Sequence, residues 1–215
     1  MDPSRGYNRT ARKLLHIAGG AGALALPFPK VIPYWLVLTA VVAMTVLALV
    51  LKPSHNWLLR VLSKPADRVR GVITGLRGYC FAVLLLLLLG PLYTYLIPDA
   101  ERFVMLGWLA LAWGDGLAGL IGPSPAEAAT VPWNRHKTWW GYIACLVGIL
   151  AAYLVAFSVP WPGLIAGEWH CGLVCGGITA LIISFLESCN LRIDDNYIVG
   201  LGTPLLALGL SWWLA

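Results

Sequence analysis

The chain has few charged side chains for its length. Asp, Glu, Lys and Arg make up only 12% of its 215 residues, whereas soluble domains carry about 25%. Acids are the scarcer kind, with 10 Asp and Glu against 15 Lys and Arg. The shortage extends along the whole sequence and 59% of the residues are hydrophobic. This composition excludes an ordinary soluble domain, whose apolar surface would aggregate in water, and predicts a single membrane domain over residues 1–215.

Several sequence signals are also missing. No Gly-x-x-x-x-Gly-Lys-Ser/Thr motif occurs, which excludes a Walker A nucleotide site. No internal repeat is visible, whereas transporters often consist of related halves. No small-x-small cleavage site precedes a soluble domain, so we expect the first apolar stretch to be a membrane helix or a half-buried helix, and not a signal peptide.

Long apolar runs dominate what the sequence does contain. A helix needs about 20 mostly apolar residues to cross the hydrocarbon core of a bilayer. Suitable runs cover residues 12–28, 33–51, 78–97, 103–122, 139–159, 169–187 and 197–214. We therefore expect an all-α fold, a polytopic transmembrane helical bundle of about seven spans.

The basic residues predict how this bundle is oriented. Lys and Arg gather on the cytoplasmic side of membrane proteins. A cytoplasmic N-terminus places all of them on that side except Lys30 and Arg102. The longest of the resulting inner loops, 52–77, mixes Trp57 and several leucines with positive charges. This composition suits either an amphipathic helix on the inner leaflet or a plain topogenic loop.

Two groups of ionisable residues belong to the first and fourth runs. A charge at the middle of a membrane helix costs about 2.5–3.5 kcal/mol on insertion scales, so such residues usually have a function. Arg12, Lys13 and His16 are spaced three or four apart on one helix face, although topology alone could explain the two cations. Asp115 stands between glycines that let a ligand approach the backbone closely. Its carboxylate could hold Mg²⁺, accept a proton or form a structural ion pair.

Two more groups follow the fourth and sixth runs. Arg135, Lys137 and Thr138 precede an expected helix, whose N-terminal N–H groups together with the cations favour phosphate. A positive-inside loop is the alternative for this segment. The last group comprises Glu187, Asn190, Asp194, Asp195 and Asn196. Its many oxygen ligands suit a hard divalent ion. A polar inner loop is the alternative for this group.

The four groups converge on one predicted membrane face. Acids that suit Mg²⁺ and bases that suit phosphate together favour phosphoryl transfer from a nucleotide, where positioning and charge neutralisation supply most of the catalysis. Because the acceptor must be reachable from lipid, we expect it to be a lipid hydroxyl.

These residues also form four motifs that resemble, in order, those of the CTP-dependent lipid kinases, the family that includes dolichol kinase, phytol kinase and the fungal-type diacylglycerol kinase. The motifs are Arg12-Lys13-x-x-His16, Gly114-Asp115-x-x-Ala118-x-x-x-Gly122, Lys137-Thr138-x-x-Gly141, and Glu187 with Asp194-Asp195-Asn196. The resemblance covers nearly the whole chain. It implies transfer of the CTP γ-phosphate, with Mg²⁺ as cofactor, to a polyprenol, a phytol-like alcohol or diacylglycerol in the bilayer.

The resemblance also suggests roles for individual residues. Asp115, Lys137 and Asp195 would be catalytic. The metal would be held by Asp115, Glu187, Asp194 and Asp195, with one aspartate accepting the hydroxyl proton. Phosphate or nucleotide would contact Arg12, Lys13, His16, Arg135, Thr138, Asn190 and Asn196. No nucleic acid polymer is expected as a partner.

Two other functions are compatible with the same sequence. A CTP:phosphatidate cytidylyltransferase also has a Gly-Asp element and late paired aspartates, although its longer lysine-aspartate and glycine-histidine stretch is absent. A non-enzymatic membrane transporter should instead place its ionisable groups near the bilayer midplane.

Overall fold

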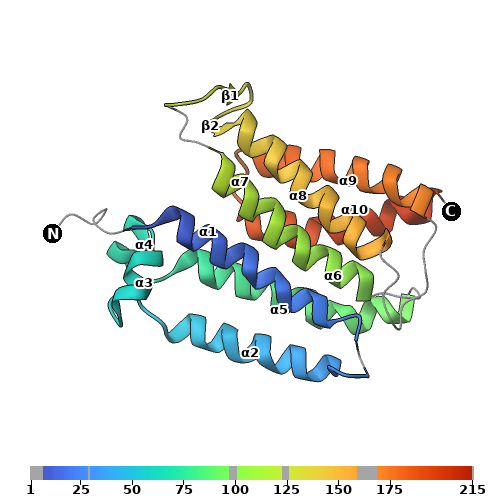
Figure 1. Cartoon of the computed structure of the whole chain (residues 1–215), viewed down its shortest axis with the longest axis horizontal. Helices are drawn as coiled ribbons and strands as arrows, with labels where there is room; N and C mark the ends of the chain where they lie inside the picture. The colour runs from blue at the N-terminus through green and yellow to red at the C-terminus, as the bar shows by residue number, and fades with distance from the viewer. Residues whose placement is uncertain (1–6, 29, 97–100, 123–125, 159–168, 215) are drawn as a thin grey trace.

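The fold is described from a computed structural model that covers residues 7–28, 30–96, 101–122, 126–158 and 169–214 (Figure 1). Its helices are α1 (Arg9–Ala18), the 3-10 helix η1 (Gly19–Ala25), α2 (Tyr34–Val50), α3 (Trp57–Leu62), α4 (Pro65–Arg70), α5 (Thr74–Leu96), α6 (Glu101–Ala110), the π-helical turn η2 (Leu111–Asp115), α7 (Gly116–Ile121), α8 (Trp139–Ser158), α9 (Trp169–Ser188) and α10 (Asp195–Leu214). Two short strands, β1 (Thr130–Val131) and β2 (Asn134–Thr138), pair antiparallel in a hairpin.

The long helices coincide with the predicted apolar runs. Each run falls on one helix or on a series of consecutive helices, and the predicted ends at 97 and 159 lie outside the described residues. The prediction of a mainly helical fold is confirmed, whereas the hairpin was not predicted. By length and hydropathy, three described helices could cross a membrane: Thr74–Leu92, Glu101–Ile121 and Trp139–Phe157. The count of about seven spans and the cytoplasmic N-terminus stay predictions.

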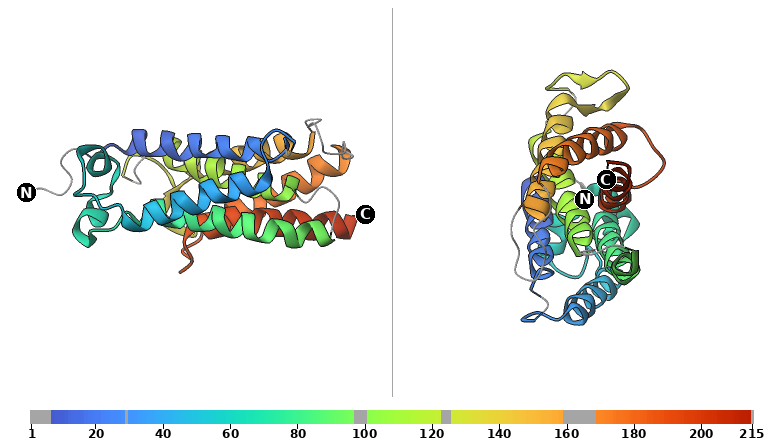
Figure 2. Two further views of the ribbon diagram at one scale, coloured as in Figure 1. Left: turned by 90° about the horizontal axis from the view of Figure 1, so that it is seen from below. Right: turned by 90° about the vertical axis from the view of Figure 1, so that its right-hand side faces the viewer.

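The long helices run roughly along one axis of an elongated bundle (Figures 1 and 2). The series α6–η2–α7 lies at its centre, with α1, α2 and α5 on one side and α8, α9 and α10 on the other. The central position agrees with burial, because every residue from Arg102 to Ala110 is buried. Arg102, at the far end of the bundle from the hairpin, donates a hydrogen bond of 2.7 Å to the carbonyl oxygen of Ala156.

Glycines bring the central helix close to α8. A Cβ added at Gly148 would lie 2.7 Å from the carbonyl carbon of Trp113, and one at Gly114 would lie 2.9 Å from Cγ1 of Ile149. The chain forms the π turn η2 at this contact. A π turn holds one more residue than an α turn, so it changes the direction in which the following side chains point. Asp115 is the last residue of this turn.

The loop 52–77 folds into two short helices, α3 and α4, at the same end of the bundle as the hairpin (Figure 1). The buried carboxylate of Asp67 fixes this segment: it accepts hydrogen bonds from the backbone N–H of Lys64, at 3.2 Å, and from the Thr74 hydroxyl, at 2.6 Å. Gly71 ends α4 with a φ of 68°, a backbone conformation that favours glycine. Because Asp67 bonds to both Lys64 and Thr74, it holds Lys64 beside the start of α5.

Candidate active site

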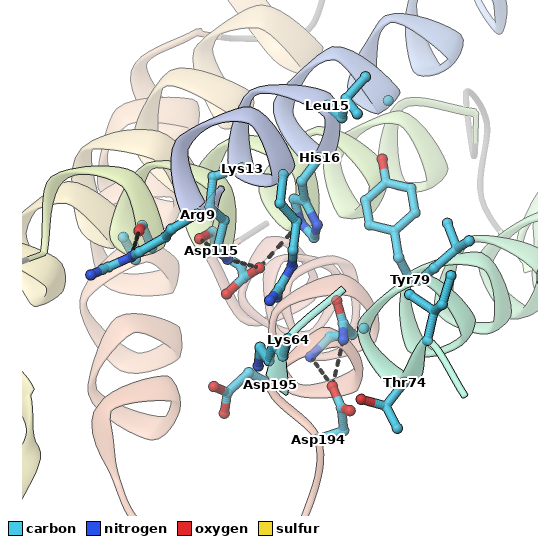
Figure 3. Close-up of a pocket in the computed structure, with 18 of the residues that line it drawn as sticks. Arg9, Lys13, Leu15, His16, Lys64, Thr74, Tyr79, Asp115, Asp194 and Asp195 are labelled. Carbon is cyan, nitrogen blue, oxygen red and sulfur yellow. Dashed lines mark hydrogen bonds and ion pairs between the residues drawn. The ribbon is translucent and has the colours of Figure 1, made fainter. Parts of the chain in front are cut away.

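A cavity of about 830 Å³ lies at the hairpin end of the bundle. Its charged lining comes from segments far apart in the sequence (Figure 3). Among the described residues this lining consists of Arg9, Arg12, Lys13, Lys64 and Lys137 and of the acids Asp115, Glu187, Asp194 and Asp195. His16, His136 and Thr138 also line the cavity. Most of the residues that the sequence singled out are therefore together.

Helix α1 supplies two side chains that contact Asp115, those of Lys13 and His16. Nζ of Lys13 lies 2.8 Å from Oδ2 of Asp115 and 3.0 Å from its carbonyl oxygen. Nε2 of His16 lies 3.2 Å from the same Oδ2 and 3.1 Å from the carbonyl oxygen of Leu111. The close approach of α1 to α7 allows these contacts, because a Cβ at Gly119 would lie 2.5 Å from Nζ of Lys13. Asp115 is thus a paired carboxylate in the C-terminal half of the helix series α6–η2–α7.

The ring of Tyr79 holds His16 in place. The two rings meet edge to face, with centroids 4.5 Å apart. The Tyr79 hydroxyl in turn accepts a hydrogen bond of 2.9 Å from Nε1 of Trp108 on α6. Tyr79 and Trp108 line the cavity, and sequence reasoning missed both, because neither carries a charge or belongs to a recognisable motif.

Lys137 bridges two acids that the sequence separates widely. Its ammonium donates a short hydrogen bond to Oε1 of Glu187 and lies 2.9 Å from Oδ2 of Asp195. Burial alone would lower the pKa of Lys137, but the two carboxylates outweigh burial and raise this pKa above its usual value. Lys137 therefore carries its positive charge throughout the physiological pH range.

The hairpin brings Lys137 to α9 through contacts at the end of that helix. The side-chain amide of Asn134 donates a hydrogen bond of 2.9 Å to the carbonyl oxygen of Ser188, and Nε1 of Trp133 donates one of 2.8 Å to the Ser188 hydroxyl. Directly after the strand, the Thr138 hydroxyl accepts a hydrogen bond of 3.2 Å from the N–H of Gly141 and so caps the first turn of α8. Thr138 thus has an evident structural role.

Three carboxylates from three different elements meet in this cavity. Oxygens of Asp115, Glu187 and Asp195 all lie within 4.8 Å of one another. Opposite ligands of Mg²⁺ are about 4.2 Å apart, because each oxygen lies at about 2.0–2.1 Å from the ion. The donor atoms therefore suit a hard divalent cation after a small inward movement. Glu187 and Asp195 would have to release Lys137 at least in part.

Asp194 and Asn196 lie beside this trio and are not part of it. Oδ1 of Asp194 accepts hydrogen bonds from the backbone N–H of Asn196, at 2.9 Å, and from its side-chain amide, at 2.6 Å, at the start of α10. The Asn196 side chain is buried and its Oδ1 has no hydrogen-bond partner among the described residues. A buried oxygen of this kind suits a ligand that brings a donor or a cation.

Two residues predicted for the site lie elsewhere, and two others belong to it. Arg135 and Asn190 are exposed and do not line the cavity. Arg9 and Lys64 line the cavity and were not predicted. Arg9 is one helical turn before Arg12 and Lys13, so its spacing could have indicated it. No local signal indicates Lys64, which Asp67 positions from within the loop.

Arg9 and Lys64, the two cavity cations that were not predicted, differ in their surroundings. Arg9 donates hydrogen bonds to the carbonyl oxygens of Gly119 and Gly122 at the end of α7. A cation in this place stabilises a helix, because the helix C-terminus carries partial negative charge. Burial, and then the charge of Arg12, lower the pKa of Lys64. Such a lysine is stabilised by an incoming anion.

Comparisons with known proteins give two relatives. The chain is 33% identical over 143 residues to a protein named phytol kinase from Synechocystis sp., a match that covers 62% of this chain and 54% of that protein. It is 31% identical over 152 residues to a protein named probable phytol kinase 2, chloroplastic, from Glycine max, covering 66% of this chain and 51% of that protein. The chain thus spans about half the length of these curated relatives. No protein-family model and no solved structure matches it.

Proposed function

We propose that this protein is a membrane kinase that transfers the γ-phosphate of CTP to the hydroxyl of a lipid alcohol with the help of Mg²⁺. The observation that carries the proposal is the cluster of Asp115, Glu187 and Asp195 in contact with Lys13 and Lys137 in one cavity. The two relatives named phytol kinase favour a lipid alcohol as the acceptor. CTP as donor rests on the resemblance of the four motifs.

The charge balance of the cavity suits a nucleotide triphosphate. Its described lining carries five cationic side chains and four carboxylates. When the substrates are absent, these charges neutralise one another in pairs such as Lys13 with Asp115. Bound Mg²⁺ would neutralise charge on the β- and γ-phosphates. The carboxylates can then turn to the cation and the ammonium groups to phosphate, so no charge is left unpaired.

We assign the residues of the chain as follows. Lys137, Lys13, Arg12 and Lys64 bind the phosphates, because each is a cation of the cavity lining. Asp115, Glu187 and Asp195 hold Mg²⁺, and Asp194 shapes the first turn of α10.

A carboxylate must also take the proton of the lipid hydroxyl. Both carboxylates are paired, Asp195 with Lys137 and Asp115 with Lys13 and His16. Asp195 suits this role better, because its side chain is 40% exposed against 17% for Asp115 and can offer its second oxygen to the hydroxyl while the first faces the metal. A general base must lie within hydrogen-bond reach of the proton that it removes. An exposed carboxylate at the cavity wall can meet a hydroxyl that arrives from the lipid.

The three helices long and apolar enough to cross a membrane support a place in the bilayer for this bundle. We propose that the cavity opens to the cytoplasmic face, because the basic residues of the loop 52–77 lie at the same end. A soluble nucleotide and a membrane alcohol then meet at the interface between water and lipid.

The test compares CTP labelled at the γ-phosphate with CTP labelled at the α-phosphate. The purified protein, reconstituted in vesicles, is incubated with each nucleotide and with phytol, a polyprenol or diacylglycerol as the alcohol acceptor, or with phosphatidate as the acceptor of a cytidylyltransferase. We expect lipid to receive label from the γ-position and CDP to be released. Transfer of the α-label with release of pyrophosphate would indicate a cytidylyltransferase instead. ATP labelled at the γ-phosphate serves as the comparison that tests the choice of nucleotide.

A further inference from the structure

The cavity extends beyond the charged cluster into an apolar groove. Along this part its walls come from three helices: Leu15 on α1, Val41 and Met44 on α2, and Cys80 and Val83 on α5. These side chains bear no charge and lie in the same cavity as Asp115 and Lys13. The groove is therefore continuous with the candidate active site.

The groove is open along one side. Helix α2 packs on α5 but makes hardly any contact with α1 in the described part of the chain. Figure 1 shows α1 and α2 diverging toward the hairpin end, with α5 between them in this view. The floor is well packed, since Cys80, Val83 and Trp108 are buried.

The edges of this opening are apolar and exposed. The side of α1 contributes Leu15, which is 56% exposed, and the side of α2 contributes Met44, which is 52% exposed. In water such edges would be unfavourable, whereas hydrocarbon solvates them. The polar end of the cavity, with Lys64 and Lys137, has the opposite character and suits the nucleotide.

We propose that the lipid alcohol enters sideways from the bilayer between α1 and α2, with its chain between Leu15 and Met44 and its hydroxyl directed toward Asp115 and Asp195. This inference rests on the proposed function, because it concerns the acceptor of the same reaction. It makes Leu15, Val41 and Met44 binding residues that the charged motifs do not include. It also explains how an insoluble acceptor and a soluble donor reach one site from different directions.

The size of the groove limits which part of the lipid is recognised. On α5 the lining of the cavity extends from Thr74 to Val83. A rise over nine residues corresponds to a length of about 14 Å along a helix. A long isoprenoid or acyl chain is longer than this and must extend through the side opening into the membrane. We therefore expect the protein to recognise the part of the chain near the hydroxyl and to tolerate different lengths beyond it.

The first test places a bulky side chain at the opening. Met44→Trp narrows the groove, and Val46→Trp is the matched control, because Val46 is 55% exposed on the same helix and does not line the cavity. We expect Met44→Trp to raise KM for phytol about tenfold or more, the size of effect that one misfitting apolar group causes. KM for CTP and the rate with the short alcohol geraniol should change little. Equal KM values for phytol in the two variants would overturn the proposed route.

A second test does not depend on catalysis. A long-chain alcohol that carries a diazirine near its hydroxyl is photolysed in vesicles with the full chain, and the labelled peptides are identified. Labelling of the segments around Leu15 and Met44 supports the side opening, and labelling confined to other segments contradicts it. If the wild-type protein transfers no phosphate to any alcohol, the proposed function fails, while the labelling still decides whether the groove binds lipid.

Discussion

Replacing Lys137 with methionine is the most informative single change, because the Lys137 ammonium and the proposed divalent cation would compete for the same carboxylates. Its Nζ contacts both Glu187 and Asp195, two of the three carboxylates that could hold a metal. Methionine keeps the length of the side chain and removes its charge. The change should therefore abolish phosphate transfer and at the same time strengthen the binding of Mg²⁺ in the absence of nucleotide.

The magnitude follows from the spacing of the acids. Oxygens of Glu187 and Asp195, the two acids that Lys137 contacts, lie within 4.8 Å of each other. At an effective dielectric constant of about 20, two negative charges at this separation repel each other by about 3.5 kcal/mol. Lys137 offsets this repulsion in the wild-type protein. In the variant Lys13 still faces Asp115, but the repulsion between Glu187 and Asp195 must be offset by a proton or a metal ion. Solvent can relieve little of the charge on Glu187, because its side chain is only 3% exposed.

The assay is thermal unfolding in detergent, with and without Mg²⁺. We expect the variant to unfold at a lower temperature than wild type when EDTA is present, and Mg²⁺ to raise its Tm by more than it raises that of wild type. Lys52→Met is the control, since it removes the same charge from an exposed position that does not line the cavity. Equal Mg²⁺ shifts in wild type and Lys137→Met would refute the idea that Lys137 occupies the place of the metal.

Two further substitutions test how the site is positioned. In Gly119→Ala the new methyl group must displace the Lys13 side chain, so transfer should fall about tenfold or more. The Tm should change little, because the far end of a lysine moves easily. Gly177→Ala should keep full activity, because among the described residues no atom beyond its own stretch of helix lies within 4 Å of the added Cβ. Asn134→Ala removes the hydrogen bond to Ser188 that docks the hairpin, which should raise KM for CTP and lower the free energy of unfolding by about 1–3 kcal/mol, measured by denaturant titration. A loss of stability at Asn134 with an unchanged KM would mean that docking does not position Lys137.

The sequence predicted the long helices well, because their apolar runs are set by local composition. Each run becomes a helix or a series of helices, and Trp139–Ser158 begins where the run 139–159 begins. The apolar runs did not predict the irregular structure within a helix. The run 103–122 contains the π turn Leu111–Asp115, which forms where Gly114 and Gly148 bring two helices together. This contact joins residues far apart in the sequence.

The candidate site was predictable where its residues share one helix. Arg12, Lys13 and His16 have helical spacing, and all three line the cavity. The hairpin was not predictable in this way. Arg135 and Lys137 are two residues apart and looked equivalent, but only Lys137 lines the cavity. The difference depends on the folding of the hairpin against the end of α9, which local sequence does not specify.

The paired charges also suggest why binding and reaction would be coupled in this protein. Without substrates, Lys13 and Lys137 neutralise Asp115, Glu187 and Asp195, so the empty cavity is not strongly charged. Neither phosphate alone nor a divalent cation alone can take these partners without leaving the opposite charges unpaired, and an unpaired buried charge is strongly unfavourable. Under the proposed function the two would therefore bind best together, as a metal–nucleotide complex. The lipid alcohol would then meet a site that is assembled only when the proposed phosphate donor is present, which would suppress loss of the γ-phosphate to water.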